Sequence, residues 1–200
     1  VVELSLLQII PGLLLALHYF IQISRPNWGF LSDKGGNRTF WIIIGVIILC
    51  LGSVLACIGI LLIPENYLFG LTISIFAYTL IGIGVGASGT SLLAFLATRT
   101  DNSKKAAAAT ITWIMMIFGA AFTAIFVGKI IDPYSIEKLL KIVTIISLFW
   151  IITSFITLYK LENTHKQKVL DRFDPVSITF FQGLKQVLLE QNTRWFTIFV

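Results

Sequence analysis

Long apolar stretches alternate with short polar segments along most of the chain. A helix needs about 20 predominantly apolar residues to cross the hydrocarbon core of a bilayer, which is roughly 30 Å thick. We therefore expect five membrane-spanning helices, at residues 4–24, 39–63, 69–97, 107–131 and 142–159. The pattern predicts an all-α, polytopic membrane helical bundle.

The same pattern divides the chain into three regions. The bundle of five helices occupies residues 1–160, a cytoplasmic central loop occupies 161–194, and the next transmembrane helix starts at 195–200. Because the chain starts at Val1 without a methionine and stops inside an apolar run, we expect it to be an internal fragment.

The central loop contains a segment that is typical of a short amphipathic helix. Asp174 and Pro175 fit a helix start, as the capping residue and a first-turn residue. Apolar side chains then recur at helical spacing, at Ile178, Phe181, Leu184 and Leu188. Such a helix either lies in the cytoplasmic interface of the membrane or packs under the bundle as a linker.

The composition excludes a soluble domain. Hydrophobic residues make up 56 % of the chain and charged residues 12 %, whereas an ordinary globular domain carries roughly 25 % charged residues. The mean hydropathy is +0.89. The net charge of +5 comes from loop residues that form no basic stripe, so we expect no nucleic-acid partner.

The distribution of Lys and Arg predicts the orientation in the membrane, because cytoplasmic loops carry the excess of these residues. The external side holds three of them, Lys129, Lys138 and Lys141. The other side holds twelve: Arg25, Lys34, Arg38, Arg99, Lys104, Lys105, Lys160, Lys166, Lys168, Arg172, Lys185 and Arg194. The loops at 25–38 and 98–105 are therefore predicted to be cytoplasmic.

The polar loop after the first span carries candidate functional residues. Gly29 permits a tight helix exit, and Gly35 and Gly36 permit turn conformations with positive φ. Asp33 and Arg38 place opposite charges at the mouth of a helix. We expect Asp33 to form a partly buried pair with Arg99, at the cytoplasmic end of the third span, and so to hold one conformation closed. The alternative is an ordinary polar loop.

Residues 29–38, which read Gly-Phe-Leu-Ser-Asp-Lys-Gly-Gly-Asn-Arg, resemble the signature between the second and third helices of the major facilitator superfamily. In that superfamily the signature is G-x-L-a-D-r-x-G-r-[KR]. The resemblance implies a bundle that is the N-terminal half of such a protein, with helices two to six and the start of helix seven. The first helix of that half would be missing.

Glycines crowd the third span. Residues 84–89 match the G-x-G-x-x-G pattern of dinucleotide sites, but they lie inside a membrane span and not in a soluble βαβ unit. Small residues four positions apart let helix backbones approach closely. We therefore expect helix packing at four glycines: Gly82, Gly84, Gly86 and Gly89.

A narrower resemblance covers nearly the whole chain. In order and spacing, five segments are similar to the bacteriochlorophyll-delivery branch of the superfamily, the PucC-like proteins: residues 1–4, 84–94, 106–116, 132–135 and 194–200. The resemblance implies a role in light-harvesting complex assembly. It also implies (bacterio)chlorophyll as the candidate cargo, light-harvesting apoproteins and the lipid bilayer as partners, and the bacterial inner membrane (photosynthetic or thylakoid) as the location.

Two alternative functions stay open at this point. One is an ordinary solute transporter that works by alternating access, and the other is an assembly chaperone that moves no substrate. No resident cofactor and no metal site is expected. Because the chain shows no nucleophile–base pair, and Cys50 and Cys57 fit buried free thiols, we expect no enzyme.

His18 is the one ionisable side chain deep inside an expected span. Such residues usually mark an ion or substrate path. An imidazole can ligate the magnesium of chlorophyll, which makes His18 a candidate pigment ligand. The alternative is a structural hydrogen bond to Gln22, one helical turn away.

Overall fold

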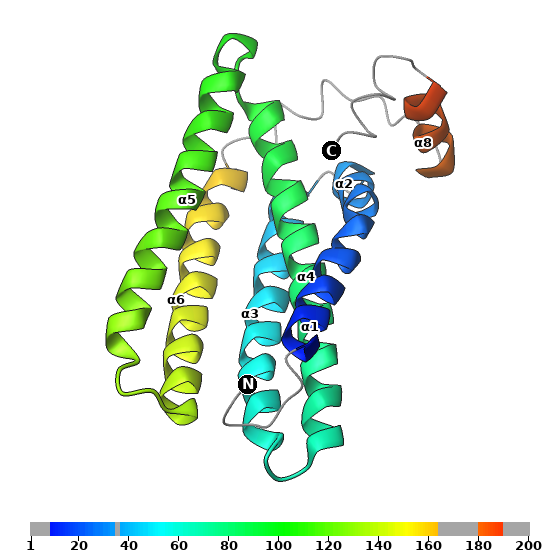
Figure 1. Cartoon of the computed structure of the whole chain (residues 1–200). Coiled ribbons are helices and arrows are strands. Elements are labelled where there is room, and N and C mark those ends of the chain that lie inside the picture. The colour runs from blue at the N-terminus through cyan, green and yellow to red at the C-terminus, as the bar shows by residue number, and fades with distance from the viewer. Residues whose placement is uncertain (1–8, 35–36, 164–179, 190–200) are drawn as a thin grey trace. The chain divides into compact units, whose positions relative to one another are not determined.

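The computed structural model describes residues 9–34, 37–163 and 180–189. All of its regular elements within these ranges are helices: α1 (Ile9–Ile21), the 3-10 turn η1 (Gln22–Ser24), α2 (Arg25–Lys34), α3 (Arg38–Leu62), α4 (Tyr67–Arg99), the 3-10 turn η2 (Asn102–Lys104), α5 (Lys105–Ile130), α6 (Ile136–Asn163) and α8 (Phe180–Leu189), as Figure 1 shows. The chain divides into two compact units, Val1–Leu161 and Glu162–Val200.

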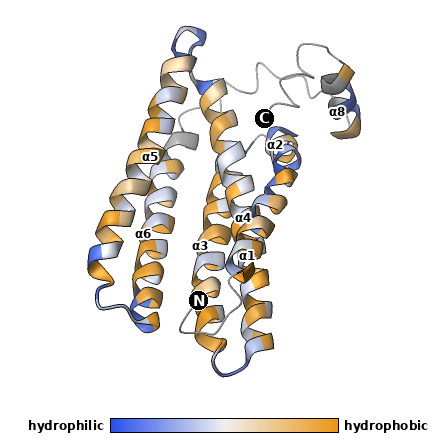
Figure 2. Ribbon diagram, viewed as in Figure 1, coloured by the Kyte–Doolittle hydropathy of each residue, from blue (hydrophilic) through white to orange (hydrophobic). Residues whose placement is uncertain are grey.

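Four helices of the described ranges are long and apolar enough to cross a membrane: Arg38–Leu62, Tyr67–Arg99, Asn102–Ile130 and Ile136–Tyr159. Many of their large apolar side chains are exposed, as a lipid environment requires, and most of each ribbon has a hydrophobic colour in Figure 2. The prediction of a polytopic helical bundle is thereby confirmed. The first expected span is described only from Ile9 onward, as α1, and its residues 4–8 lie outside the described ranges.

Two expected connections are partly helical, and the predictions there were wrong. Most of the expected loop at 25–38 is α2, where Pro26 occupies the first turn, a position that needs no backbone N–H donor. The expected connection at 132–141 is shorter, because α6 already begins at Ile136. There the Ser135 hydroxyl accepts a hydrogen bond from the Lys138 backbone N–H at 3.1 Å and caps the helix.

Helices α3 and α4 form an antiparallel pair whose contact surface consists mainly of small residues. They are joined by a turn at residues 63–66, where Asn66 caps α4 by accepting from the Phe69 backbone N–H at 3.1 Å. The buried residues of α3 include Gly45, Gly52 and Gly59. Those of α4 are Gly70, Ser74, Ala77, Gly82, Gly84, Gly86, Ala87 and Ser91, of which Gly82 and Gly86 face the α1–α2 segment.

The remaining helices of the first unit differ in how much of their surface is buried against other helices. The α1–α2 segment packs on α4. A contact to α6 comes from Cys50 of α3, whose thiol donates to the backbone carbonyl of Ser147 at 3.6 Å. No residue of α5 is buried, and its apolar side chains are available to surrounding lipid.

Candidate functional site

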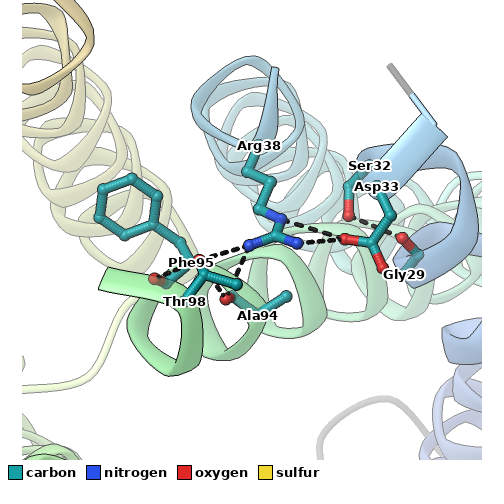
Figure 3. Close-up of polar contacts among 7 residues, drawn as sticks. All are labelled: Gly29, Ser32, Asp33, Arg38, Ala94, Phe95 and Thr98. Atoms are coloured by element: carbon teal, nitrogen blue, oxygen red, sulfur yellow. Dashed lines mark hydrogen bonds and ion pairs between the residues drawn. The ribbon is translucent and has the colours of Figure 1, made fainter. Parts of the chain in front are cut away.

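Arg38 joins three helices at the end of the α3–α4 pair that the charge distribution predicts to be cytoplasmic. It lies in the first turn of α3. Its guanidinium donates to Asp33 of α2 through Nε at 3.0 Å and Nη2 at 2.7 Å. On the other side, Nη1 donates to the Ala94 carbonyl of α4 at 3.0 Å and to the Thr98 hydroxyl. Figure 3 shows the guanidinium between the two helices.

The ion pair is open to water on its acidic side. The Asp33 side chain is 57 % exposed, while that of Arg38 is 18 % exposed. The expectation was of a partly buried pair, and here the Arg38 side chain is largely buried while more than half of the Asp33 side chain is exposed. Exposed pairs of this kind contribute roughly 0–1 kcal/mol. The tie between α2 and α4 consequently depends more on Arg38 than on Asp33.

The expected pairing of Asp33 with Arg99 is also wrong. Arg38 follows Asp33 after a short connection and reaches it directly. Arg99 instead stacks on its own helix, with its guanidinium carbon 5.3 Å from the centre of the Phe95 ring. That distance suits a cation–π contact. Arg99 is thus occupied by an aromatic neighbour one turn away, and the ion pair forms without it.

Helix α2 is fixed against α4 by close contacts behind Asp33. A Cβ added at Gly29 would lie 3.2 Å from the Thr90 methyl group. Ser32, which is fully buried, donates to the Gly29 carbonyl at 2.8 Å. Gly29 therefore permits a close approach within a helix, and it is not a helix exit as expected. Gly36, the other glycine expected to matter here, lies outside the described ranges.

The glycines expected to pack helices have different surroundings. A Cβ at Gly84 would lie 2.5 Å from the Leu49 backbone nitrogen, and one at Gly82 would lie 2.8 Å from the Ile21 Cβ. At Gly86 the nearest atom, on Trp28, is at an ordinary 3.4 Å. Gly89 has no neighbour within 4 Å, so the expectation of packing there is wrong. It lies on a more open side of α4.

The glycines of α3 that pack against α4 were missed by sequence reasoning. Gly45, Gly52 and Gly59 recur every seven residues on α3, and Gly84, Ala77 and Gly70 recur every seven residues on α4. A Cβ at Gly45 would lie 2.5 Å from the Ser88 nitrogen, and one at Gly52 would lie 2.9 Å from the Ala77 carbonyl oxygen. The seven-residue spacing of small residues in two consecutive spans was the signal that could have found them.

His18 lies in a polar row on one side of the α1–α2 segment. The Gln22 amide carbonyl accepts from Arg25, which turns its amide nitrogen toward His18 Nε2, at 2.7 Å. With Gln22 donating, Nε2 is the acceptor and the imidazole proton is on Nδ1. Nδ1 is buried and has no partner among the described residues.

This geometry favours the hydrogen-bonded interpretation of His18 over pigment ligation. A magnesium ion needs the lone pair of an imidazole nitrogen, and here the available lone pair is on Nε2, where Gln22 holds it. Nδ1, which carries the proton, is covered by protein. Ligation would require the bond to Gln22 to break.

Comparison with known proteins supplies the family. The model of the family described as "PUCC protein" matches residues 1–200. Over all 200 residues the chain is 48 % identical to a protein of Rhodobacter capsulatus named "Bacteriochlorophyll synthase 44.5 kDa chain". The chain spans 46 % of that relative's length. No solved structure matches the chain. Because the family model covers every residue, the chain belongs to the PUCC protein family.

Proposed function

We propose that the protein containing this chain aids the assembly of light-harvesting complexes by delivering or holding (bacterio)chlorophyll. The observation that carries the proposal is the match of the entire chain to the PUCC family. The relative from Rhodobacter capsulatus supports it, since its name ties it to bacteriochlorophyll. The photosynthetic membrane of a bacterium is the corresponding location.

The chemistry of the spans supports an apolar cargo. Every Asp and Glu of the described ranges lies at or beyond a helix end or in a connection: Asp33, Glu65, Asp101, Asp132, Glu137 and Glu162. Ionisable groups inside a membrane usually line ion or proton paths. The polar groups within the spans are instead neutral, such as Thr72, Ser74 and Thr79, which bond their own helix backbone. This pattern suits a pigment better than an ionic solute.

We propose a non-enzymatic role, although the relative's name includes the word synthase. In the described ranges no group of three or more His, Cys, Asp or Glu side chains could hold a metal ion. The proposed work is binding and transfer of an intact pigment. The major facilitator architecture and a transporter-like movement belong to the same proposal.

In this proposal the contacts of Arg38 with Asp33, Ala94 and Thr98 hold the predicted cytoplasmic end of the bundle in one conformation. Arg38 ties α2 and α4 to the first turn of α3. A change in the relative position of these helices must break at least one of those contacts. Exposure of Asp33 makes its contact the easier one to break.

The test is purification of the intact protein in mild detergent from cells that make bacteriochlorophyll. Pigment absorbance at a constant ratio to protein supports the proposal, with an unrelated protein of the same membrane purified in parallel as the control. A second measurement is light-harvesting complex accumulation in a strain that lacks the protein. Loss of complex without bound pigment would favour the chaperone, and normal complex accumulation would contradict the assembly role.

A further inference from the structure

Helix α8 has an apolar side, which is formed by residues along most of its length. In a helix with 3.6 residues per turn, the positions of Phe180, Phe181, Leu184, Val187 and Leu188 fall within one sector of the circumference. Gln182 and Gln186 fall on the opposite sector. Both hydrophilic and hydrophobic residues are visible along α8 in Figure 2. Except for the last residue, Leu189, which is 71 % exposed and falls beside Gln182, the helix is divided lengthwise into an apolar and a polar side.

The apolar side includes a large side chain that is open to its surroundings. Phe181 is 77 % exposed, and its ring meets that of Phe180 edge-on at 5.7 Å. Transfer of such an exposed aromatic side chain from water to an apolar environment is favourable. The headgroup boundary of a bilayer offers such an environment, and amphipathic helices enter it with their apolar side.

The excess of basic residues in the central loop favours contact with an anionic membrane surface. Between Lys160 and Arg194 the sequence has six Lys or Arg residues and four Asp or Glu residues. Lys185 is exposed and lies beside the apolar sector of α8, where a long basic side chain can keep its stem on apolar surface and its ammonium group among headgroups. Basic segments next to a span are attracted to anionic lipids.

The chain also brings α8 close to a bilayer. The last membrane span of the first unit ends at Tyr159, and α8 begins at Phe180. A connection of this length gives α8 a high effective concentration at the membrane surface. We propose that α8 lies flat on the anionic inner leaflet, with Phe181 inserted at the headgroup boundary and Lys185 at the lipid phosphates. This proposal does not depend on the identity of the cargo.

The experiment uses the intact protein in vesicles and a fluorescent label on a single new cysteine. Phe181→Cys places the label on the apolar side, and Gln182→Cys is the matched control on the opposite side. Cys50 and Cys57 are buried, and the unmodified protein measures any labelling of them. Lipids brominated on their acyl chains quench a label that lies in the bilayer.

We expect quenching at position 181 to exceed that at position 182 by about two-fold or more, because an interfacial helix buries its apolar side at the boundary of headgroups and acyl chains. The difference should be larger in vesicles of phosphatidylcholine mixed with phosphatidylglycerol than in phosphatidylcholine alone. The difference between the two positions should shrink when Lys185→Glu is introduced into both labelled proteins. Lys185→Arg in both should preserve it. Equal quenching at the two positions would overturn the proposal, as would a label at 181 that no lipid quenches. Quenching indifferent to phosphatidylglycerol and to Lys185→Glu would overturn the anionic surface as its partner.

Discussion

Arg38 holds Asp33 at 2.7 Å across the connection between α2 and α3, while the same guanidinium donates to the Ala94 carbonyl of α4. The two residues are unequal partners, because 57 % of the Asp33 side chain is exposed and only 18 % of the Arg38 side chain. Substitution of Arg38 and substitution of Asp33 should therefore affect the stability of the protein differently.

Arg38→Gln should destabilise the protein more than Asp33→Asn. Asp33→Asn removes an exposed ion pair, which contributes roughly 0–1 kcal/mol. Arg38→Gln removes the contacts to α4 as well, and hydrogen bonds to charged groups contribute about 1.5–3 kcal/mol. Thermal unfolding of the intact protein in detergent measures the difference. Arg38→Lys is the matched control, which keeps the charge but loses the planar fork.

Asp33 and Arg38 should couple, and Asp33 and Arg99 should not. The double variant Asp33→Asn with Arg38→Gln should be less than additive, because the two side chains touch. Asp33→Asn combined with Arg99→Gln should be additive within about 0.5 kcal/mol. Coupling of Asp33 to Arg99 instead would contradict the observed pairing. Accumulation of light-harvesting complex in strains carrying the same variants checks the proposed functional role.

Gly84→Ala and Gly89→Ala should change stability in opposite directions. At Gly84 a Cβ would lie 2.5 Å from the Leu49 backbone nitrogen, so α3 and α4 must separate. Overpacking of this kind costs about 1–3 kcal/mol. At Gly89 there is open space, and alanine in a helix is favoured over glycine by roughly 0.5–1 kcal/mol. Melting temperatures of the two variants test this, and a Gly84→Ala variant at least as stable as the unmodified protein would show that the backbones are not in contact at Gly84.

The orientation of the bundle can be read by labelling intact cells. Cysteines at positions 66 and 137 should react with a reagent that cannot cross the membrane, and cysteines at 34, 104 and 168 should not. The reason is the excess of Lys and Arg at the end of the bundle that carries Lys34 and Lys104. The reverse pattern would invert the predicted topology.

Gln22→Leu should destabilise more than the double variant His18→Leu with Gln22→Leu. The single change leaves both imidazole nitrogens without a partner among the described residues, and a buried unsatisfied polar group costs about 1–3 kcal/mol. Replacing both residues removes that cost. Unfolding measurements check the order, and the pigment content of His18→Leu tests ligation separately: unchanged pigment fits the hydrogen-bonded role.

The class of fold was predictable because membrane spans depend on the length and hydropathy of single segments. The α3–α4 contact was only half predictable. Gly84 carried a visible local pattern, but Gly45 acquires meaning only when two helices are aligned antiparallel, as the turn at residues 63–66 imposes.

The partner of Asp33 was not predictable from charge and position alone. Arg38 and Arg99 are both cations at the same end of the bundle. The choice between them depends on two conformational details: the helical continuation of residues 25–34, which brings Asp33 up to the start of α3, and the stacking of Arg99 on Phe95. Neither detail follows from hydropathy.

The seam between α3 and α4 has a consequence for the order in which the protein folds. Its contacts lie at increasing distances from one turn, first Gly59 with Gly70, then Gly52 with Ala77, then Gly45 with Gly84. The first contact closes a short loop at a small entropic cost, and each contact formed shortens the loop that the next must close. The hairpin can therefore close progressively outward from residues 63–66, through contacts between its own two helices.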